Sequence, residues 1–146
     1  MPTELHPDFP VVSGDYTLTA QWRLRLPEQF NRRIEDGSMV LWRPELTFWI
    51  NVWNNDRQAS VDELLDAILK SAHPKRRAEV VERGGAVARL TYELAEEDAQ
   101  DAGSMQESVN GYIFAASSYV QISGYYDTPE AGAMARKAIA SVAPAQ

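Results

Sequence analysis

The chain has 146 residues, the size of one ordinary domain, and it can bury enough surface to fold without a metal ion or a disulfide. Its net charge of −7 argues against non-specific binding of nucleic acid, which depends on neutralising phosphates, and against docking on anionic membranes. The absence of cysteine excludes disulfides, thiol catalysis and cysteine-ligated zinc or iron–sulfur sites.

The N-terminal residues show neither the basic region nor the long apolar stretch of a secretory signal, so we expect a soluble, cytoplasmic protein. The longest uncharged run, residues 108–126, is about the length of a membrane span, but it contains polar side chains and alternates, which predicts a hairpin. Residues 1–14 carry three prolines and no hydrophobic period, which predicts an irregular arm. A single domain is then expected over residues 15–146.

The first regular pattern lies in residues 16–25, where apolar and polar side chains alternate as in a strand. Pro27 suits the first turn of a helix, and Phe30 and Ile34 are four residues apart. We therefore expect a short helix after this strand, with Gly37 as its C-cap.

Residues 38–43 and 46–53 predict a pair of strands, and Pro44 fits position i+1 of a type I turn between them. Such a turn places Leu41 opposite Phe48 and Met39 opposite Ile50 on one side, with Trp42 opposite Thr47 and Val40 opposite Trp49 on the other. One side is aliphatic and belongs in a core, whereas the other mixes tryptophan with an amide and a hydroxyl.

Two long helices follow from capping signals and 3.6-residue periodicity. Ser60 and Glu63 form a capping box ahead of the first. Its apolar stripe is Val61, Leu64, Leu65, Ile68 and Leu69. Thr128 caps the second, whose stripe is Ala131, Met134, Ala135, Ala138, Ile139 and Val142.

Two further hairpins are expected between these helices. Gly84-Gly85 separates strands at residues 79–83 and 86–93. Ser117-Ser118 separates strands at residues 109–116 and 119–126, and tight pairing there places Ile113 opposite Ile122 and Ala115 opposite Val120. Residues 96–105 are acidic and predict a solvated loop.

The order of these elements predicts an α+β fold, an α/β sandwich. In it a mainly antiparallel sheet of about six to seven strands packs with two long amphipathic helices and one short helix. The pattern leaves open whether the helices cover one side of the sheet or both.

Motifs for catalysis and metal binding are absent from the sequence. There is no phosphate-binding glycine loop, no serine-hydrolase elbow and no zinc-protease helix. His73 follows a predicted helix and is interpreted as a solvated helix-end residue. The acidic segment lacks the spacing of a calcium-binding loop. We therefore assign no catalytic residue, no metal site and no cofactor, and an enzymatic role is disfavoured.

The most informative pattern is the second side of the predicted sheet, where aromatic rings interleave with polar groups. Its members are Trp42, Trp49, Asn51, Trp53, Tyr112 and Phe114, with Arg23 as a further candidate from the first strand. Rings of this kind offer large contact area with few rotors to freeze, which suits recognition. The competing interpretation is that a helix covers this face and the rings are ordinary core.

Two segments resemble the PsbP-like α/β sandwich superfamily, which includes DcrB-type lipoproteins and effector-associated chaperones of type VI secretion. One is residues 22–30, where a strand runs into Leu26-Pro27. The other is residues 119–126, followed by the helix that ends at Val142. The resemblance implies an antiparallel sheet between helix layers and a non-enzymatic binding or accessory role, and it carries over no catalytic residue.

Three functions stay open at this point. The first is a small soluble binding or accessory protein, for example a chaperone or immunity-type partner of a secreted effector, that uses the aromatic sheet face. The second is a small-ligand-binding or enzymatic domain with a pocket beside Trp49 and Tyr112, which a nearby Glu93 or His73 would favour. The third is a homodimer that buries the aromatic face.

Overall fold

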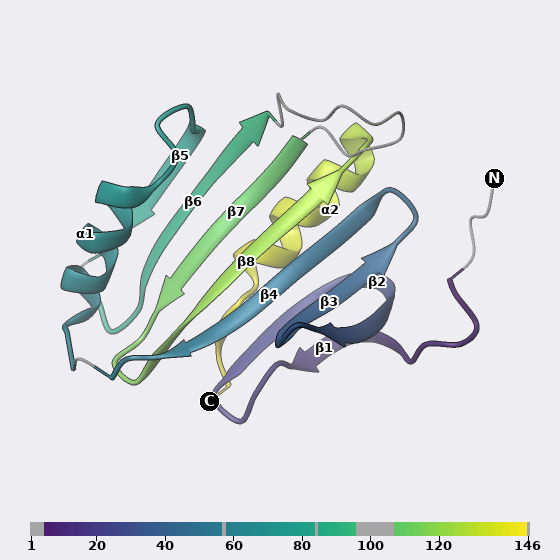
Figure 1. Cartoon of the computed structure of the whole chain (residues 1–146), viewed down its shortest axis with the longest axis horizontal. Coiled ribbons are helices and arrows are strands. Elements are labelled where there is room, and N and C mark those ends of the chain that lie inside the picture. The colour runs from purple at the N-terminus through teal and green to yellow at the C-terminus, as the bar shows by residue number, and fades with distance from the viewer. Residues whose placement is uncertain (1–4, 57, 84, 96–106, 146) are drawn as a thin grey trace.

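A nine-stranded antiparallel sheet dominates the protein (Figure 1). The structure, a computed structural model, describes residues 5–56, 58–83, 85–95 and 107–145. The strands are β1 (Val11–Thr17), β2 (Trp22–Glu35), β3 (Ser38–Arg43), β4 (Leu46–Asn54), β5 (Arg77–Glu82), β6 (Ala88–Ala95), β7 (Glu107–Phe114), β8 (Ser118–Tyr126) and β9 (Ala143–Pro144). Their order in the sheet is β1-β2-β3-β4-β8-β7-β6-β5, and β9 pairs with β2.

The predicted fold class is wrong in its balance of helix and strand. The described residues form two short helices, α1 (Val61–Ser71) and α2 (Pro129–Ala140), of 11 and 12 residues. The same part of the chain forms nine strands in place of the six to seven expected. Both helix starts are nevertheless as predicted, because the Ser60 capping box and the Thr128 cap are formed.

The short helix expected after residue 26 is instead part of β2. A spacing of four residues, as between Phe30 and Ile34, fits a strand as well as a helix because four is also a multiple of two. Pro27 is tolerated because the pairing of β1 with β2 shifts register between Val12 and Gly14, opposite this point. The predicted helix C-cap, Gly37, lies in the β2–β3 turn at φ 85° after Asp36 at φ 51°.

The regular pattern over residues 16–25 is interrupted by a turn between β1 and β2. The predicted irregular arm also ends early, because β1 begins at Val11. Residues ahead of β1 are held by Asn31, which accepts a hydrogen bond from His6 N at 2.6 Å and donates to His6 O at 2.9 Å.

β2 bends so strongly that both of its ends lie near the second half of β4. At its start, Trp22 Nε1 donates a hydrogen bond of 2.7 Å to Ser118 Oγ, and Ser118 lies opposite the end of β4. At its end, Glu35 pairs with Ser38, whose hydroxyl donates to Asn51 Oδ1 at 2.9 Å. The first half of β2 is therefore rolled across one face of the sheet.

We call the face under this roll the first face and the opposite one the second face. The first face packs against α2 and the start of β2 to form the main core. Its fully buried large side chains include Trp22, Leu24, Phe30, Leu41, Leu46, Phe48, Ile113, Ile122 and Ile139. Figure 1 shows α2 behind the sheet.

A smaller core lies on the second face, under α1. It contains Leu65, Ala88, Leu90, Tyr92 and Phe114. Leu65, which the helical stripe predicts as buried, is fully buried, and Ile68 is half-buried. The helices thus lie on opposite faces, and α1 packs mainly on the β6–β7 part of the second face.

The predicted register of β3 with β4 is confirmed at all four residue pairs. The turn between them is not type I, because Glu45 has φ 70°, which position i+2 of a type II turn requires. The predicted register of the β7–β8 hairpin is wrong by two residues, since Ile113 pairs with Val120 and not with Ile122. An even shift keeps every side chain on its predicted face.

The hairpin predicted around Gly84-Gly85 is formed by β5 and β6, with Glu82 opposite Arg89, so the turn is longer than two residues. Val80 and Val81 of β5 are both exposed, at 54% and 37%. The acidic loop expected at residues 96–105 lies outside the described residues.

Replacing Leu65 by Ala is expected to lower the free energy of unfolding by about 2–5 kcal/mol, through lost transfer energy and a cavity under α1. Chemical denaturation measures the change. Lys70→Ala, at an exposed position of the same helix, is the control and should stay within about 0.5 kcal/mol of wild type. An unchanged midpoint for Leu65→Ala would show that α1 does not pack on the sheet.

Replacing Gly124 by Ala tests how closely α2 approaches the first face. A Cβ there would lie 2.8 Å from Phe48 Cε1 and 3.2 Å from Ala135 Cβ, so the packed groups must shift. We expect a loss of about 1–3 kcal/mol in thermal or chemical unfolding. Gly85→Ala, where the Cβ meets open space, is the matched control. Equal stability of the two variants would contradict this packing.

Candidate functional site

Three neighbouring strands present uncharged side chains on the second face, of which Ser108, Asn110 and Phe114 are buried and the others are partly or fully exposed. The cross-strand pairs place β8 between β4 and β7, so their alternate residues form a grid. Its members are Thr47, Trp49, Asn51 and Trp53 from β4, Tyr119, Gln121, Ser123 and Tyr125 from β8, and Ser108, Asn110, Tyr112 and Phe114 from β7. We call these twelve residues the aromatic–amide floor. None of them carries a charge, although 24% of the chain is charged.

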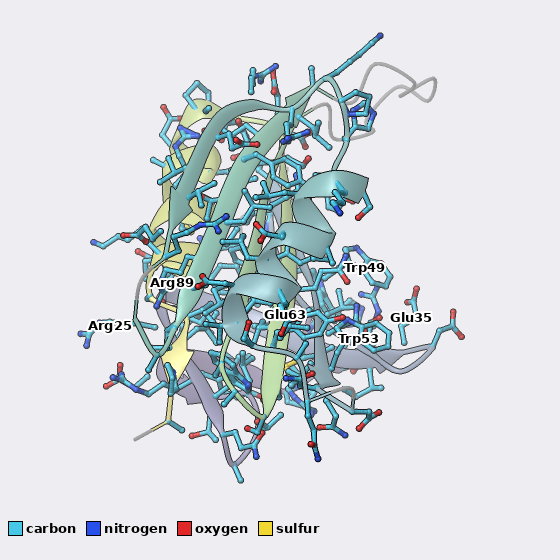
Figure 2. All side chains as sticks on the ribbon, turned by 90° about the vertical axis from the view of Figure 1, so that its left-hand side faces the viewer. Arg25, Glu35, Trp49, Trp53, Glu63 and Arg89 are labelled. Carbon is cyan, nitrogen blue, oxygen red and sulfur yellow. The ribbon has the colours of Figure 1, made fainter. Side chains whose placement is uncertain are left out.

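The two tryptophans of β4 are the prominent rings of this floor. Figure 2 shows Trp49 and Trp53 pointing out on the side opposite α2. Trp53 is 48% exposed, and its Nε1 donates a hydrogen bond of 3.3 Å to Gln121 Oε1. Trp49 is half-buried. Large rings held in place at the surface can contact a partner without losing much side-chain freedom.

Side-chain hydrogen bonds hold the polar groups of the floor in place. Gln121 Nε2 donates to Tyr112 Oη at 3.3 Å, so this amide bridges a tyrosine and Trp53. Ser123 Oγ donates to Asn110 Oδ1 at 2.7 Å. Asn51 Oδ1 accepts from Ser38 of β3 at 2.9 Å. These contacts reduce the entropy that binding would otherwise cost.

Next to α1, the residues of the aromatic–amide floor belong to the smaller core or pack against it. Phe114 is fully buried, and its ring stacks on Tyr112 at 6.2 Å and tilts against Tyr119 at 5.3 Å between centroids. A hollow of about 270 Å³ lies between the helix and the sheet at this border. Its lining is Asn54, Asn55, Asp56, Leu64, Ala67, Ile68, Phe114 and Tyr119.

On the β3 side, Trp42 lies under neighbouring side chains. The ring of Phe9 meets it edge-on at 5.0 Å between centroids. The guanidinium of Arg33 lies 4.6 Å from the centre of the Trp42 ring. Trp42 therefore anchors the N-terminal residues and is only half exposed to a partner.

Arg23 does not join the floor. It lies in the rolled half of β2 between the buried residues Trp22 and Leu24, so it points away from the core into solvent. Figure 2 shows Arg25, which has the same orientation along β2, on the far side of the molecule from Trp49.

The structure thus brings together four of the seven predicted site residues on one open surface: Trp49, Asn51, Trp53 and Tyr112. The pocket predicted beside Trp49 and Tyr112 does not coincide with the hollow at α1, which neither of these residues lines. Glu93 faces the other side of the sheet, where Arg136 approaches it at 3.6 Å. His73 is exposed and accepts a hydrogen bond from Lys75 N.

Sequence reasoning missed the contributions of Asn110 and Ser38 and the wall that α1 builds. Gln121 and Ser123 alternate with the core residues Val120 and Ile122, but they are not among the predicted site residues. Alternation identifies the face of each strand, but it does not reveal that β4 pairs with β8, and this pairing assembles the floor.

The chain matches no protein-family model, and a search of curated proteins finds no match. Within the part of the chain that the structure describes, no helix is long and apolar enough to cross a membrane. No cluster of three or more histidine, aspartate or glutamate side chains suited to a metal ion occurs in that part either. The functional argument therefore depends on the geometry of the floor.

Tyr92 lies at the border of the floor, under α1, and is only 6% exposed. Burial raises its pKa to about 12, and Tyr112, with which it shares a hydrogen bond, adds to this rise. The folded protein therefore disfavours the Tyr92 phenolate more than the unfolded chain does, whose tyrosine has the ordinary pKa of 10.0.

The stability that depends on a neutral Tyr92 is fully present below pH 10 and is lost as the pH rises towards about 12. We expect wild type to lose about 2–3 kcal/mol more than Tyr92→Phe over this interval, since each pKa unit corresponds to about 1.4 kcal/mol. Urea denaturation of both proteins between pH 9 and pH 12 measures the difference. Parallel loss of stability in the two proteins would contradict the assignment.

Proposed function

We propose that this protein is a small non-enzymatic binding or accessory protein that recognises a partner protein with the aromatic–amide floor. The observation that carries the proposal is the exposure of Trp53 within an uncharged, hydrogen-bonded surface of tyrosines, serines and amides. Protein interfaces are enriched in tyrosine and tryptophan, and antibody paratopes combine such rings with serine and asparagine. A surface that only needs to stay in water would carry charges instead.

The dimensions of the floor support a central patch within a larger interface. Seven residues of β4 span about 20 Å, and three strands span about 15 Å, which gives roughly 300 Å². A standard interface buries about 800 Å² on each partner. We therefore assign the remaining contact area to α1 on one side and to β3 on the other.

The hollow beside α1 supplies a pocket for one anchoring side chain. Phe114 and Tyr119 form an aromatic base, and Leu64 and Ile68 form an apolar wall. Trp53 pairs with Tyr119 across the strands, so the pocket adjoins the exposed ring. Anchors in such pockets provide most of the energy of many interfaces.

The finer parts of the proposal concern the kind of partner and its location. We propose a chaperone or immunity-type partner of a secreted effector, acting in the cytoplasm and without nucleic acid. This kind of partner is the one that the resemblance of residues 22–30 and 119–126 to the PsbP-like superfamily implies. A partner encoded beside this protein would be the first candidate to test.

Trp53→Ala should weaken partner binding by about 2 kcal/mol, or roughly thirtyfold in Kd, because it removes an exposed anchor. It should leave most of the folding stability intact, unlike a buried tryptophan such as Trp22, whose loss costs about 3–5 kcal/mol. The partner is first isolated by co-purification and identified. Its binding to each purified variant is then measured by calorimetry, and stability by thermal melting.

Val80→Ala is the matched control, because Val80 is similarly exposed but lies on the edge strand β5. It should bind the partner as wild type does. A Trp53→Ala protein that binds normally would contradict the proposal. Light scattering that shows a wild-type dimer and a monomeric Trp53→Ala protein would assign the floor to a second copy of the chain instead.

A further inference from the structure

A second hollow, of about 470 Å³, opens at the end of the sheet and is lined by residues of both faces. It lies between the β1–β2 turn, the β2–β3 turn and the second half of β4. Six apolar side chains line it: Leu18, Ile34, Met39, Ile50, Val52 and Trp53. Its volume is within the range of about 300–1,000 Å³ that is usual for small-ligand sites.

The apolar lining of this hollow is open to water. Ile34 is 56% exposed, the highest value among the large exposed hydrophobic side chains of the described residues. Met39 and Val52 are half-buried, whereas Ile50 behind them is buried. Apolar surface gathered in a hollow, rather than scattered, indicates a place for an apolar ligand.

One carboxylate, that of Asp36, lies at the rim. It is the one charged residue among those that line the hollow. Asp36 makes no hydrogen bond or ion pair with another residue of the described chain. Its position in the turn, with φ 51°, sets it beside the apolar lining.

Among the described residues, no neighbouring cationic side chain pairs with the Asp36 carboxylate. Arg33 and Glu35 on β2 pair with each other at 2.9 Å. Arg32 shares the first face with Ile34 but does not line the hollow. Residues 18–21 and 50–54, which bound the other sides, bring no charged side chain.

We infer that this hollow binds a small amphiphilic cation, whose apolar part covers Ile34 and Met39 and whose ammonium group faces Asp36. The net charge of −7 attracts such a cation and repels a carboxylate of the same shape. The hollow shares Asn51 and Trp53 with the aromatic–amide floor. The inference rests on Asp36, Ile34 and Met39, which lie outside the floor, so it does not depend on the function proposed for that floor.

The β2–β3 turn provides a conservative test of the carboxylate. A turn in which both central residues have positive φ favours Asp-Gly and Asn-Gly equally well. Asp36→Asn therefore removes the charge and keeps the turn. Ile34→Thr reduces the apolar lining while keeping a β-branched residue in the strand.

The probes are octylammonium, 1-octanol and octanoate, titrated at pH 7 into isotopically labelled protein. Chemical shifts of the Ile34 and Met39 methyl groups report binding in the hollow. We expect saturable shifts with octylammonium, and binding of 1-octanol that is about two- to fivefold weaker, as for loss of an exposed ion pair. Octanoate should bind more weakly still.

Asp36→Asn should lose most of the preference for octylammonium over 1-octanol, and Ile34→Thr should bind both about fivefold more weakly or worse. Val80→Thr, at an exposed apolar position on the other edge of the sheet, should leave both affinities unchanged. The inference is overturned if the two methyl groups show no saturable shift. It is also overturned if octanoate binds as tightly as octylammonium, or if Asp36→Asn keeps the full preference for the cation.

Discussion

The pairing of β4 with β8 is the interaction on which the rest of the structure depends. Nine residue pairs, from Leu46 with Tyr126 to Asn54 with Ser118, join the first half of the chain to the second. Without this ladder the β1–β4 strands and the β5–β8 strands would form two separate small sheets. With it, Phe48 and Ile50 face Gly124 and Ile122 across the seam, and α2 can cover both.

The same pairing sets the chemical character of both faces. Strand alternation sends Phe48 and Ile50 to the core and Trp49 and Asn51 to the other side. Gly124 is needed on the core side because Phe48 and Ala135 already occupy the space that its Cβ would take. On the second face, α1 packs on β6 and β7 and does not cover the middle of β4. The rings of Trp49 and Trp53 therefore have no helix over them.

Several local features could be predicted from sequence, whereas the fold class could not, and the errors have physical causes. The capping box at Ser60, the cap at Thr128 and the β3–β4 register depend on residues close in sequence, so local pattern finds them. The helix predicted around Phe30 is wrong because a spacing of four residues between apolar side chains fits both a helix and a strand. Pairing with β1 and β3 makes this stretch a strand. Residues close in sequence do not determine whether a helix covers the aromatic face. Phe114 is core and Trp53 is open because α1 packs on β6 and β7, a choice made by long-range packing.

The distance along the chain between the two partners of the central ladder has a consequence during synthesis. Asn54 and Ser118 are about 60 residues apart, so β4 leaves the ribosome on the order of several seconds before β8 does. Throughout that interval one hydrogen-bonding edge of β4, flanked by Phe48 and Ile50, has no intramolecular strand to satisfy it. Nascent chains on neighbouring ribosomes could pair through this edge, so the yield of folded protein should depend on translation speed and on whether a holdase shields β4 until β8 arrives.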